Sequence, residues 1–341
     1  MKKIGILQTA FLGDTVLIAE MIGKLNKIYG DQVQIHLIVR KGVESIFEND
    51  PRVTSITTFD KKGADRGILG LFRTIRKIRR IRLNIMLNVH RSLRSSIIAL
   101  LSGAKKVIGF KSASLSLLYS KRVLREGSHE VDKNHKLLEA LDKVFLDVAP
   151  IKSQPYKLYA PEKNKRKDLS SFEKGTYIVI APGSKWQTKR WTLDGYIELI
   201  NRLLKSYVYK VILTGDKGDI KYSDSIASRV NSTKRLIDLT GKLEIEDLFH
   251  LISKARLVIT NDSAPQHIAV GLGVSVVSIF GPTVKELGFY PYSNKAIVVE
   301  NKKIICRPCG LHGHNSCPKG THECMVTITP IEVFEAVENL L

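Results

Sequence analysis

Three short segments of the chain carry residue types that bind phosphate or move a proton: a glycine turn beside charged side chains in the first two, and a polar helix start in the third. The first is QTAFLGDTV (residues 8–16), where Gly13 permits a sharp turn from strand to helix and Asp14 follows directly. An acid at this place either caps the helix or acts as a general base on a bound hydroxyl group. The segment by itself leaves both interpretations open.

The second segment, APGSKWQTKRW (residues 181–191), follows an expected buried strand and offers phosphate-binding groups. Its glycine turn is followed by the hydroxyl of Ser184 and the charges of Lys185 and Lys189, which suit a phosphate. The alternative is a basic surface loop that Trp191 anchors in the core.

The third segment, ITNDSAPQHIAVGLG (residues 259–273), predicts a buried strand followed directly by a helix. Asp262 or Ser263 is expected to cap this helix, and the N–H groups of its first turn, with the helix dipole, attract an anion. His267 lies one turn further and is expected to face the ligand. A well-capped structural helix with a buried histidine is the alternative.

A fourth region is strongly basic. RTIRKIRRIR (residues 73–82) contains no acid, and an isoleucine recurs every third residue, which predicts an amphipathic helix with a basic face. Such a face either meets anionic lipid or phosphate or is simply solvated. Arg91 and Arg94 follow an expected strand and are candidates for binding a carboxylate or phosphate of an acceptor.

Four cysteines lie within nineteen residues, interspersed with histidines: Cys306, Cys309, Cys317 and Cys324. This pattern is compatible with a structural zinc site, with reduced thiols or with a reversible disulfide. The second half lacks the usual CxxC spacing, and we assign no metal.

The composition is typical of a globular protein with room for two domains in its 341 residues, since 43% of them are hydrophobic and 26% are charged. No run approaches the roughly 20 apolar residues that span a bilayer, and Asp14 interrupts the short apolar run at the N-terminus, which argues against a signal peptide. The 54 Lys and Arg exceed the 33 Asp and Glu, so the net charge of +21 favours an anionic partner.

The apolar pattern alternates between strands and helices in two series, which predicts two Rossmann-like domains with parallel sheets. The first series has expected strands at residues 3–8, 33–39, 81–89 and 105–110. The second has them at 177–183, 209–215, 256–260 and 274–281. Between 150 and 175 the pattern breaks into a Pro-, Lys- and Ser-rich stretch. We therefore predict domains at 1–160 and 172–341, with a last helix at 330–341.

Taken together and in this order, the segments resemble glycosyltransferase family nine, the ADP-heptose:lipopolysaccharide heptosyltransferases. The resemblance is carried by Gly13-Asp14, by Pro182-Gly183-Ser184 with Lys189 and Trp191, by Thr240-Gly241-Lys242-Leu243, by Asn261-Asp262-Ser263-Ala264-Pro265-Gln266-His267, and by the trailing FGPT and cysteine-rich stretches. Ala264 departs from the glycine that the family usually has. The resemblance covers nearly the whole chain and is strongest in its second half.

The resemblance implies a GT-B fold, in which the two Rossmann-like domains have parallel sheets that face each other across a cleft. The first domain would bind the acceptor and the second the nucleotide sugar, and the last helix would be able to pack back on the first domain. It also implies an inverting, metal-independent transfer of heptose from ADP-heptose to the lipopolysaccharide inner core, with no cofactor.

The same resemblance assigns roles to residues. Asp14 would be the catalytic base and Lys189 would neutralise the departing diphosphate, while Asp219 would accept a hydrogen bond from the ribose and Leu243 would pack by the base. The full predicted nucleotide-sugar site is Ser184, Lys185, Lys189, Asp219, Leu243, Asp262, Ser263, Ala264 and His267. Arg91 and Arg94 would bind the acidic lipopolysaccharide core, and the enzyme would be cytoplasmic and peripherally associated with the anionic inner face of the inner membrane.

Other functions also fit the sequence. A GT-B transferase with another nucleotide sugar or acceptor, or a sugar-nucleotide epimerase, shares most of these motifs. A basic nucleic-acid-binding protein with a zinc module belongs to a different class, but only 7% of residues are aromatic and no nucleic-acid motif is present. We therefore expect no nucleic-acid partner.

Overall fold

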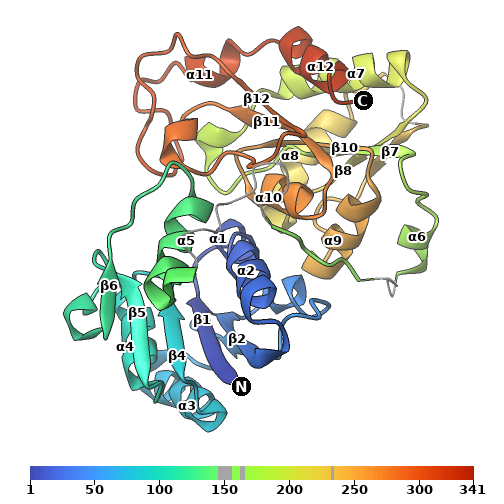
Figure 1. The fold of residues 1–341 in the computed structure, drawn as a ribbon. Coiled ribbons are helices and arrows are strands. Elements are labelled where there is room, and N and C mark those ends of the chain that lie inside the picture. Colours follow the sequence, from blue (N-terminus) through green and yellow to red (C-terminus); the bar gives the residue numbers. More distant parts are fainter. Residues whose placement is uncertain (145–155, 162–165, 232–233) are drawn as a thin grey trace. The chain divides into compact units, whose positions relative to one another are not determined.

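The computed structural model describes residues 1–144, 156–161, 166–231 and 234–341. The chain divides into two compact units, a first that ends at Tyr159 and a second that runs from Ala160 to Leu341. Each unit is built around its own six-stranded sheet (Figure 1).

The first unit has a parallel sheet in the order β3-β2-β1-β4-β5-β6. The strands are β1 (Lys2–Gln8), β2 (Val33–Arg40), β3 (Ser55–Phe59), β4 (Ile85–Asn88), β5 (Lys106–Phe110) and β6 (Lys121–Val123). The helices are α1 (Leu12–Val16), α2 (Ala19–Tyr29), α3 (Gly67–Ile81), α4 (Leu93–Leu101) and α5 (Glu130–Leu141), with a short 3-10 turn η3 (Ser116–Leu118). Helix α2 contacts α5 and α3 contacts α4, as expected for a parallel sheet with both faces covered.

The second unit has a parallel sheet in the order β12-β11-β10-β7-β8-β9. The strands are β7 (Tyr177–Ala181), β8 (Lys210–Leu213), β9 (Leu236–Asp238), β10 (Leu257–Asn261), β11 (Ser275–Phe280) and β12 (Ala296–Glu300). The helices are α6 (Lys167–Ser170), α7 (Leu193–Ser206), α8 (Ile220–Ala227), α9 (Ile245–Lys254), α10 (Ala264–Gly271), α11 (Glu323–Val326) and α12 (Pro330–Glu338). Two 3-10 turns, η5 (Gln187–Lys189) and η6 (Lys217–Asp219), follow β7 and β8.

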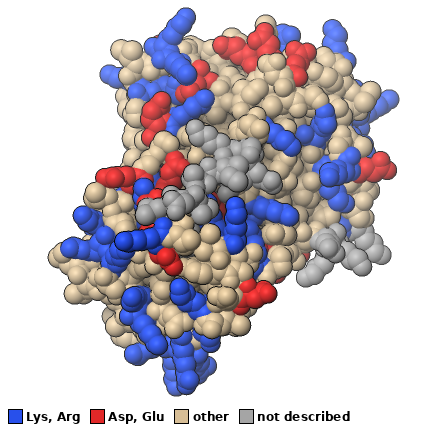
Figure 2. All heavy atoms as spheres, viewed as in Figure 1, with Lys and Arg blue, Asp and Glu red and all other residues tan. Residues whose placement is uncertain are grey.

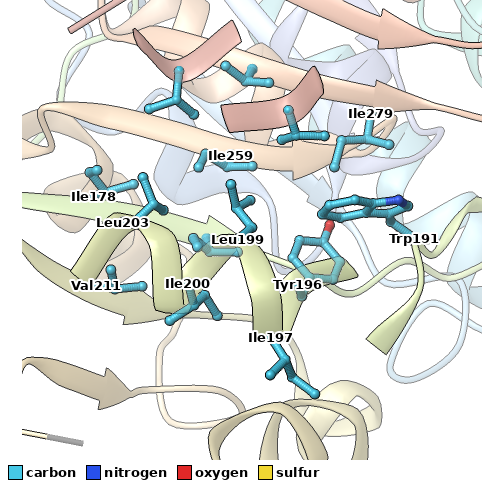
Figure 3. Close-up of a cluster of buried hydrophobic side chains, with 14 of the residues drawn as sticks. Ile178, Trp191, Tyr196, Ile197, Leu199, Ile200, Leu203, Val211, Ile259 and Ile279 are labelled. Atoms are coloured by element: carbon cyan, nitrogen blue, oxygen red, sulfur yellow. The ribbon is translucent and has the colours of Figure 1, made fainter. Parts of the chain in front are cut away.

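The core of the second unit explains one predicted anchor. Trp191 is 1% exposed and packs edge-on against Tyr196, with the ring centroids 5.0 Å apart (Figure 3). Its indole N–H donates to the carbonyl of Ile328 at 3.0 Å, so the indole is fixed by both packing and a hydrogen bond. The loop that carries Lys189 is therefore fastened to the core at its end.

The last helix, α12, packs on its own unit. Its apolar face, with Val333 and Val337 fully buried, joins the core formed by α7 and the strands. The sequence also allowed this helix to pack on the first domain; in the structure its apolar face is buried in the second unit.

The structure refines the predicted elements in three ways. The helix expected after β1 is broken into α1 and α2 by a turn at Leu17 and Ile18. The strand expected at 81–89 begins only at Ile85, because helix α3 continues to Ile81. Arg82, in a left-handed conformation with φ 58°, is the C-cap residue of that helix. The apolar pattern did not predict β3, β6, β9 and β12, which are the edge strands of the two sheets. An edge strand has one neighbour and lacks the continuous apolar run of a central strand.

In the described part of the chain, every helix falls short of the length and apolar character that crossing a membrane requires.

Candidate functional site

The carboxyl end of β1 holds Asp14 in the first unit. Phe11 is the N-cap of α1 and its backbone is extended, so Asp14 is the third residue of the helix and not its cap residue. Backbone N–H groups of Phe11 and of Asp14 itself favour the charged carboxylate. Burial nevertheless dominates and, with the nearby charge of Glu130, raises the pKa of Asp14 to about 6. An acid with this pKa is ionised at neutral pH and still accepts a proton readily, as a general base must.

Three further charged residues surround Asp14. Glu130, at the start of α5, accepts hydrogen bonds from Arg125 and, at 2.9 Å, from Lys133. Burial and the charge of Arg125 lower the pKa of Arg91, whereas the carboxylates of Glu130 and Asp14 raise it. Asp14, Arg91, Arg125 and Glu130 therefore form one electrostatic cluster, drawn from connections that follow β1, β4 and β6.

His90 stands beside this cluster as a neutral group. Its Nδ1 lies 2.8 Å from the hydroxyl of Thr9 at the end of β1. Burial, followed by the positive charges of Lys61 and Arg91, lowers the pKa of His90 to about 4. Of these residues, only Asp14 and Arg91 were predicted from the sequence; His90, Arg125 and Glu130 were not. Arg94, the second predicted acceptor residue, is exposed on α4.

In the second unit one amide joins two of the predicted loops. Asn261, fully buried at the end of β10, donates to the carbonyl of Pro182 at 2.7 Å. Its Oδ1 accepts from the backbone N–H of Trp191 at 3.1 Å and from the hydroxyl of Tyr196 at 3.0 Å. The loop of residues 181–191 is therefore held against the β10–α10 turn.

That junction places a lysine on an aspartate in the protein interior. The Nζ of Lys189 lies 2.5 Å from Oδ2 of Asp262, and both side chains are almost completely buried. Asp262 also accepts from the hydroxyl of Thr283 at 2.7 Å and from the amide of Gln266 at 2.9 Å. Thr283 and Gln266 thus fix the Asp262 carboxylate, and Asp262 in turn positions the lysine ammonium. Gln266 and Thr283 stand within the motifs quoted from the sequence, but neither was assigned a role, because neither side chain is charged.

The start of α10 differs from the predicted cap. Ser263 is the N-cap residue, but its side chain makes no capping hydrogen bond and lies 3.0 Å from the hydroxyl of Thr260 instead. The first turn, which begins at Ala264, is therefore not closed by its own cap residue, and its N–H groups suit an anion. His267 is 3% exposed and lies inside the unit beside Gln266.

The predicted ribose residue is fixed by an arginine. Asp219 accepts from Arg190 at 2.8 Å, and Arg190 also donates to the carbonyl of Ser184 at 3.1 Å. Burial, then the charge of Asp216, raises the pKa of Asp219. A Cβ atom at Gly183 would lie 2.1 Å from Cγ of Asp219, so only glycine permits this close approach. The structure thus gathers Gly183, Ser184, Arg190 and Asp219.

Two other predicted donor residues lie apart from these contacts. Lys185 is exposed, with its Nζ 5.2 Å from the centroid of the Trp186 ring. Leu243 is half-buried in the turn that leads into α9.

The cysteine-rich segment braces the Lys189 loop. The backbone N–H of His314 donates to the hydroxyl of Thr188 at 2.8 Å, and the ring of His322 lies 2.8 Å from the Thr188 carbonyl. All four cysteines are free thiols, and Cys324 is buried. Within the described ranges, no three His, Cys, Asp or Glu side chains are grouped as metal ligands would be.

Comparison with known proteins places the chain in a family. Residues 71–316 match glycosyltransferase family 9 (heptosyltransferase). The lipopolysaccharide heptosyltransferase 3 of Escherichia coli is 27% identical over 299 residues, which cover 84% of this chain and 85% of that protein. The family 9 glycosyl transferase of Veillonella parvula has a similar fold, with a TM-score of 0.82 and 23% identity over 99% of this chain and 97% of that one. The E. coli ADP-heptose lipopolysaccharide heptosyltransferase II gives a TM-score of 0.78 at 22% identity, over 100% and 98% of the chains.

These similarities confirm the GT-B fold class and the resemblance on which the site residues were assigned. The part of the chain that matches the family contains Lys189, Asp262 and the whole of α10. The chain therefore belongs to glycosyltransferase family 9, the heptosyltransferase family, and is a glycosyltransferase.

Proposed function

We propose that this enzyme transfers heptose from ADP-heptose to the acidic inner core of lipopolysaccharide, with inversion at the anomeric carbon and without a metal ion. The buried pair of Lys189 and Asp262 at the start of α10 is the observation that carries the proposal. A fixed ammonium group beside a helix N-terminus provides two sources of positive potential for a departing diphosphate. The names of the E. coli relatives indicate the sugar and the acceptor.

In the proposed reaction the acceptor hydroxyl gives its proton to the carboxylate of Asp14, and its oxygen forms a bond to the anomeric carbon. The bond from that carbon to the diphosphate oxygen breaks at the same time, and ADP leaves with the electron pair. Lys189 and the first turn of α10 stabilise the negative charge that develops on the diphosphate. A single displacement from the opposite face inverts the configuration.

The remaining donor contacts follow from the loops of the second unit. We assign Ser184, Lys185, Ser263 and Ala264 to the phosphates, Leu243 to the base and Asp219 to a ribose hydroxyl. His267, buried within α10, would act by supporting that turn. In this proposal the second unit is the donor domain and the first is the acceptor domain.

The acceptor is expected to be anionic because the first unit is basic. Arg91, within the Asp14 cluster, and Arg94, on α4, would bind carboxylate or phosphate groups of the core. The basic face of α3 would hold the enzyme at the anionic inner face of the inner membrane. This places the enzyme in the cytoplasm, peripherally bound to that membrane.

A direct test measures the thermal stability of the purified protein with ADP, UDP, GDP and duplex DNA. Selective stabilisation by ADP is expected; stabilisation by UDP or GDP alone would overturn the donor, and stabilisation by DNA alone would overturn the enzyme class proposed. Activity with ADP-heptose should survive EDTA, and a loss restored by magnesium or manganese would refute the metal-independent mechanism. Mass spectrometry of lipopolysaccharide from a strain that lacks the gene should show a missing heptose.

A further inference from the structure

Large apolar side chains are exposed along one edge of the first unit. Six of them follow the carboxyl ends of β3, β4 and β5, and we call this set the apolar rim: Ile68, Leu69, Phe72, Leu93, Leu117 and Leu118. Ile68 and Leu69 in the first turn of α3 are 72% and 82% exposed, and Leu117 in η3 is 80% exposed. Isolated exposed leucines are ordinary, but a set of this size on adjacent connections indicates a binding surface.

Contacts between the connections support their grouping. The backbone N–H of Ser114, shortly before η3, donates to the carbonyl of Arg91 at 3.0 Å, which ties the β5 connection to the β4 connection. The charge of Lys61, in the connection after β3, lowers the pKa of His90 in the connection after β4. The carboxyl ends of parallel strands all lie at the same end of a sheet, so the rim lies at the end of the sheet that also carries Asp14.

The charge of this region selects the kind of partner. Residues 66–125 contain fifteen Lys and Arg and no Asp or Glu. On α3 the exposed apolar residues occupy the first two turns, and exposed Arg76, Lys77 and Arg80 continue the helix. Figure 2 shows Lys and Arg gathered over the part of the first unit where Figure 1 places α3. Apolar side chains beside basic ones match the acyl and headgroup layers of an anionic bilayer.

We propose that the apolar rim inserts into an anionic lipid bilayer while the basic residues of α3 contact its headgroups. This inference rests on the electrostatic docking proposed above. Insertion would add to that docking a hydrophobic attraction, which salt does not screen. Because the rim shares its edge with Asp14, insertion would bring a lipid-anchored acceptor toward the base. A nucleic acid would engage the basic residues but would have no layer to receive six aliphatic and aromatic side chains.

The test is vesicle co-sedimentation of the full-length protein with phosphatidylglycerol–phosphatidylethanolamine vesicles across a salt series. The rim variant I68S/L69S/F72S should bind at least about tenfold more weakly than wild type at both low and high salt. The matched control V208S/I305S/V326S removes three exposed apolar side chains of the second unit, 88%, 98% and 58% exposed, and should bind like wild type. A second variant, L117S/L118S, lies outside α3 and should show the same salt-independent loss without any effect on that helix.

Insertion itself is read from a Phe72→Trp variant. Its tryptophan emission should shift to the blue on vesicles and be quenched by lipids that carry a bromine on the acyl chain. Unchanged emission, or a rim variant that binds as tightly as wild type, would overturn the proposal. So would a wild type that dimerises in sedimentation while the rim variant is monomeric, because the rim would then be covered by a second copy.

These outcomes are separate from the proposed function. The rim variant should keep wild-type kcat/KM on a deacylated, soluble core acceptor and lose activity only on acceptor embedded in vesicles. If the protein binds vesicles through the rim but transfers no heptose, only the proposed function fails. If it transfers heptose to the soluble acceptor and the rim variant still binds vesicles normally, only the insertion proposal fails.

Discussion

The charge of Glu130 should contribute to the pH at which the enzyme loses activity. Burial is the main cause that raises the pKa of Asp14 from 3.8 to about 6, and the carboxylate of Glu130 is the next. A general base works when it is deprotonated, so kcat/KM of the wild type should fall about tenfold per pH unit below pH 6. Glu130→Gln removes a negative charge and also leaves Arg125 without its carboxylate partner. Both changes favour the ionised form of Asp14.

The expected shift follows from the order of these causes. Because burial is a larger cause of the raised pKa of Asp14 than Glu130, the loss of Glu130 should lower the acid limb of the pH profile by about one unit or less. Arg125→Gln should move the limb in the opposite direction, since the positive charge of Arg125 lowers the pKa of Asp14. Glu126→Gln, an exposed neighbour with the same change in charge, is the matched control and should leave the limb in place.

The assay follows ADP release from about pH 5 to about pH 8.5, a range that brackets the Asp14 pKa of about 6, at saturating and at low donor concentration. Thermal unfolding of each variant at pH 7 checks that the fold is intact. Limbs that coincide in wild type, Glu130→Gln and Arg125→Gln would refute the electrostatic argument. A limb near pH 6 that survives in Asp14→Asn would show that another group is titrating.

Four further predictions concern the site and the membrane. Asp14→Asn should lower kcat by about 10²–10⁴ with donor affinity within a few fold, and near-normal turnover would return Asp14 to a structural role. Lys189→Ala should weaken ADP binding and kcat together, because its charge acts before and during departure of the diphosphate; calorimetry with ADP and steady-state rates check this, and a change in KM alone would indicate uniform binding. Asn261→Ala should lower the free energy of unfolding of the second unit by about 3 kcal/mol in chemical denaturation, since it leaves buried partners unpaired. An unchanged free energy of unfolding would show that the two loops keep their places without the Asn261 hydrogen bonds. Replacement of Arg76, Arg79 and Arg80 of α3 by Glu should weaken vesicle binding and raise the KM for membrane acceptor at low salt. Both effects should shrink as salt rises, and donor binding should not change.

The sequence determined which residues lie on loops at the carboxyl ends of strands. Central parallel strands are buried on both faces and therefore appear as continuous apolar runs, as in β7 and β10, so the residues after them could be placed without a structure. Gly183 and Ser184, and Asp262 and Ser263, were found in this way. The edge strands β3, β6, β9 and β12 were not predicted from the sequence. Each has one neighbouring strand only, so its side chains lie partly in solvent and its sequence mixes polar and apolar residues.

Only the tertiary structure decided which charged groups stand together. Lys189 meets Asp262 across 73 residues, and Asp14 is tuned by Glu130 and Arg125 from connections more than a hundred residues away. Neither partnership has a local signal. Lys189 and Asp262 meet because β7 pairs with β10, whereas β6 is three places from β1 and Glu130 comes near Asp14 only because α5 crosses back to contact α2. The sequence showed that a carboxylate, Asp14, follows a strand at a turn. The pKa of Asp14 depends on burial and on those distant charges, so only the tertiary structure could give its direction.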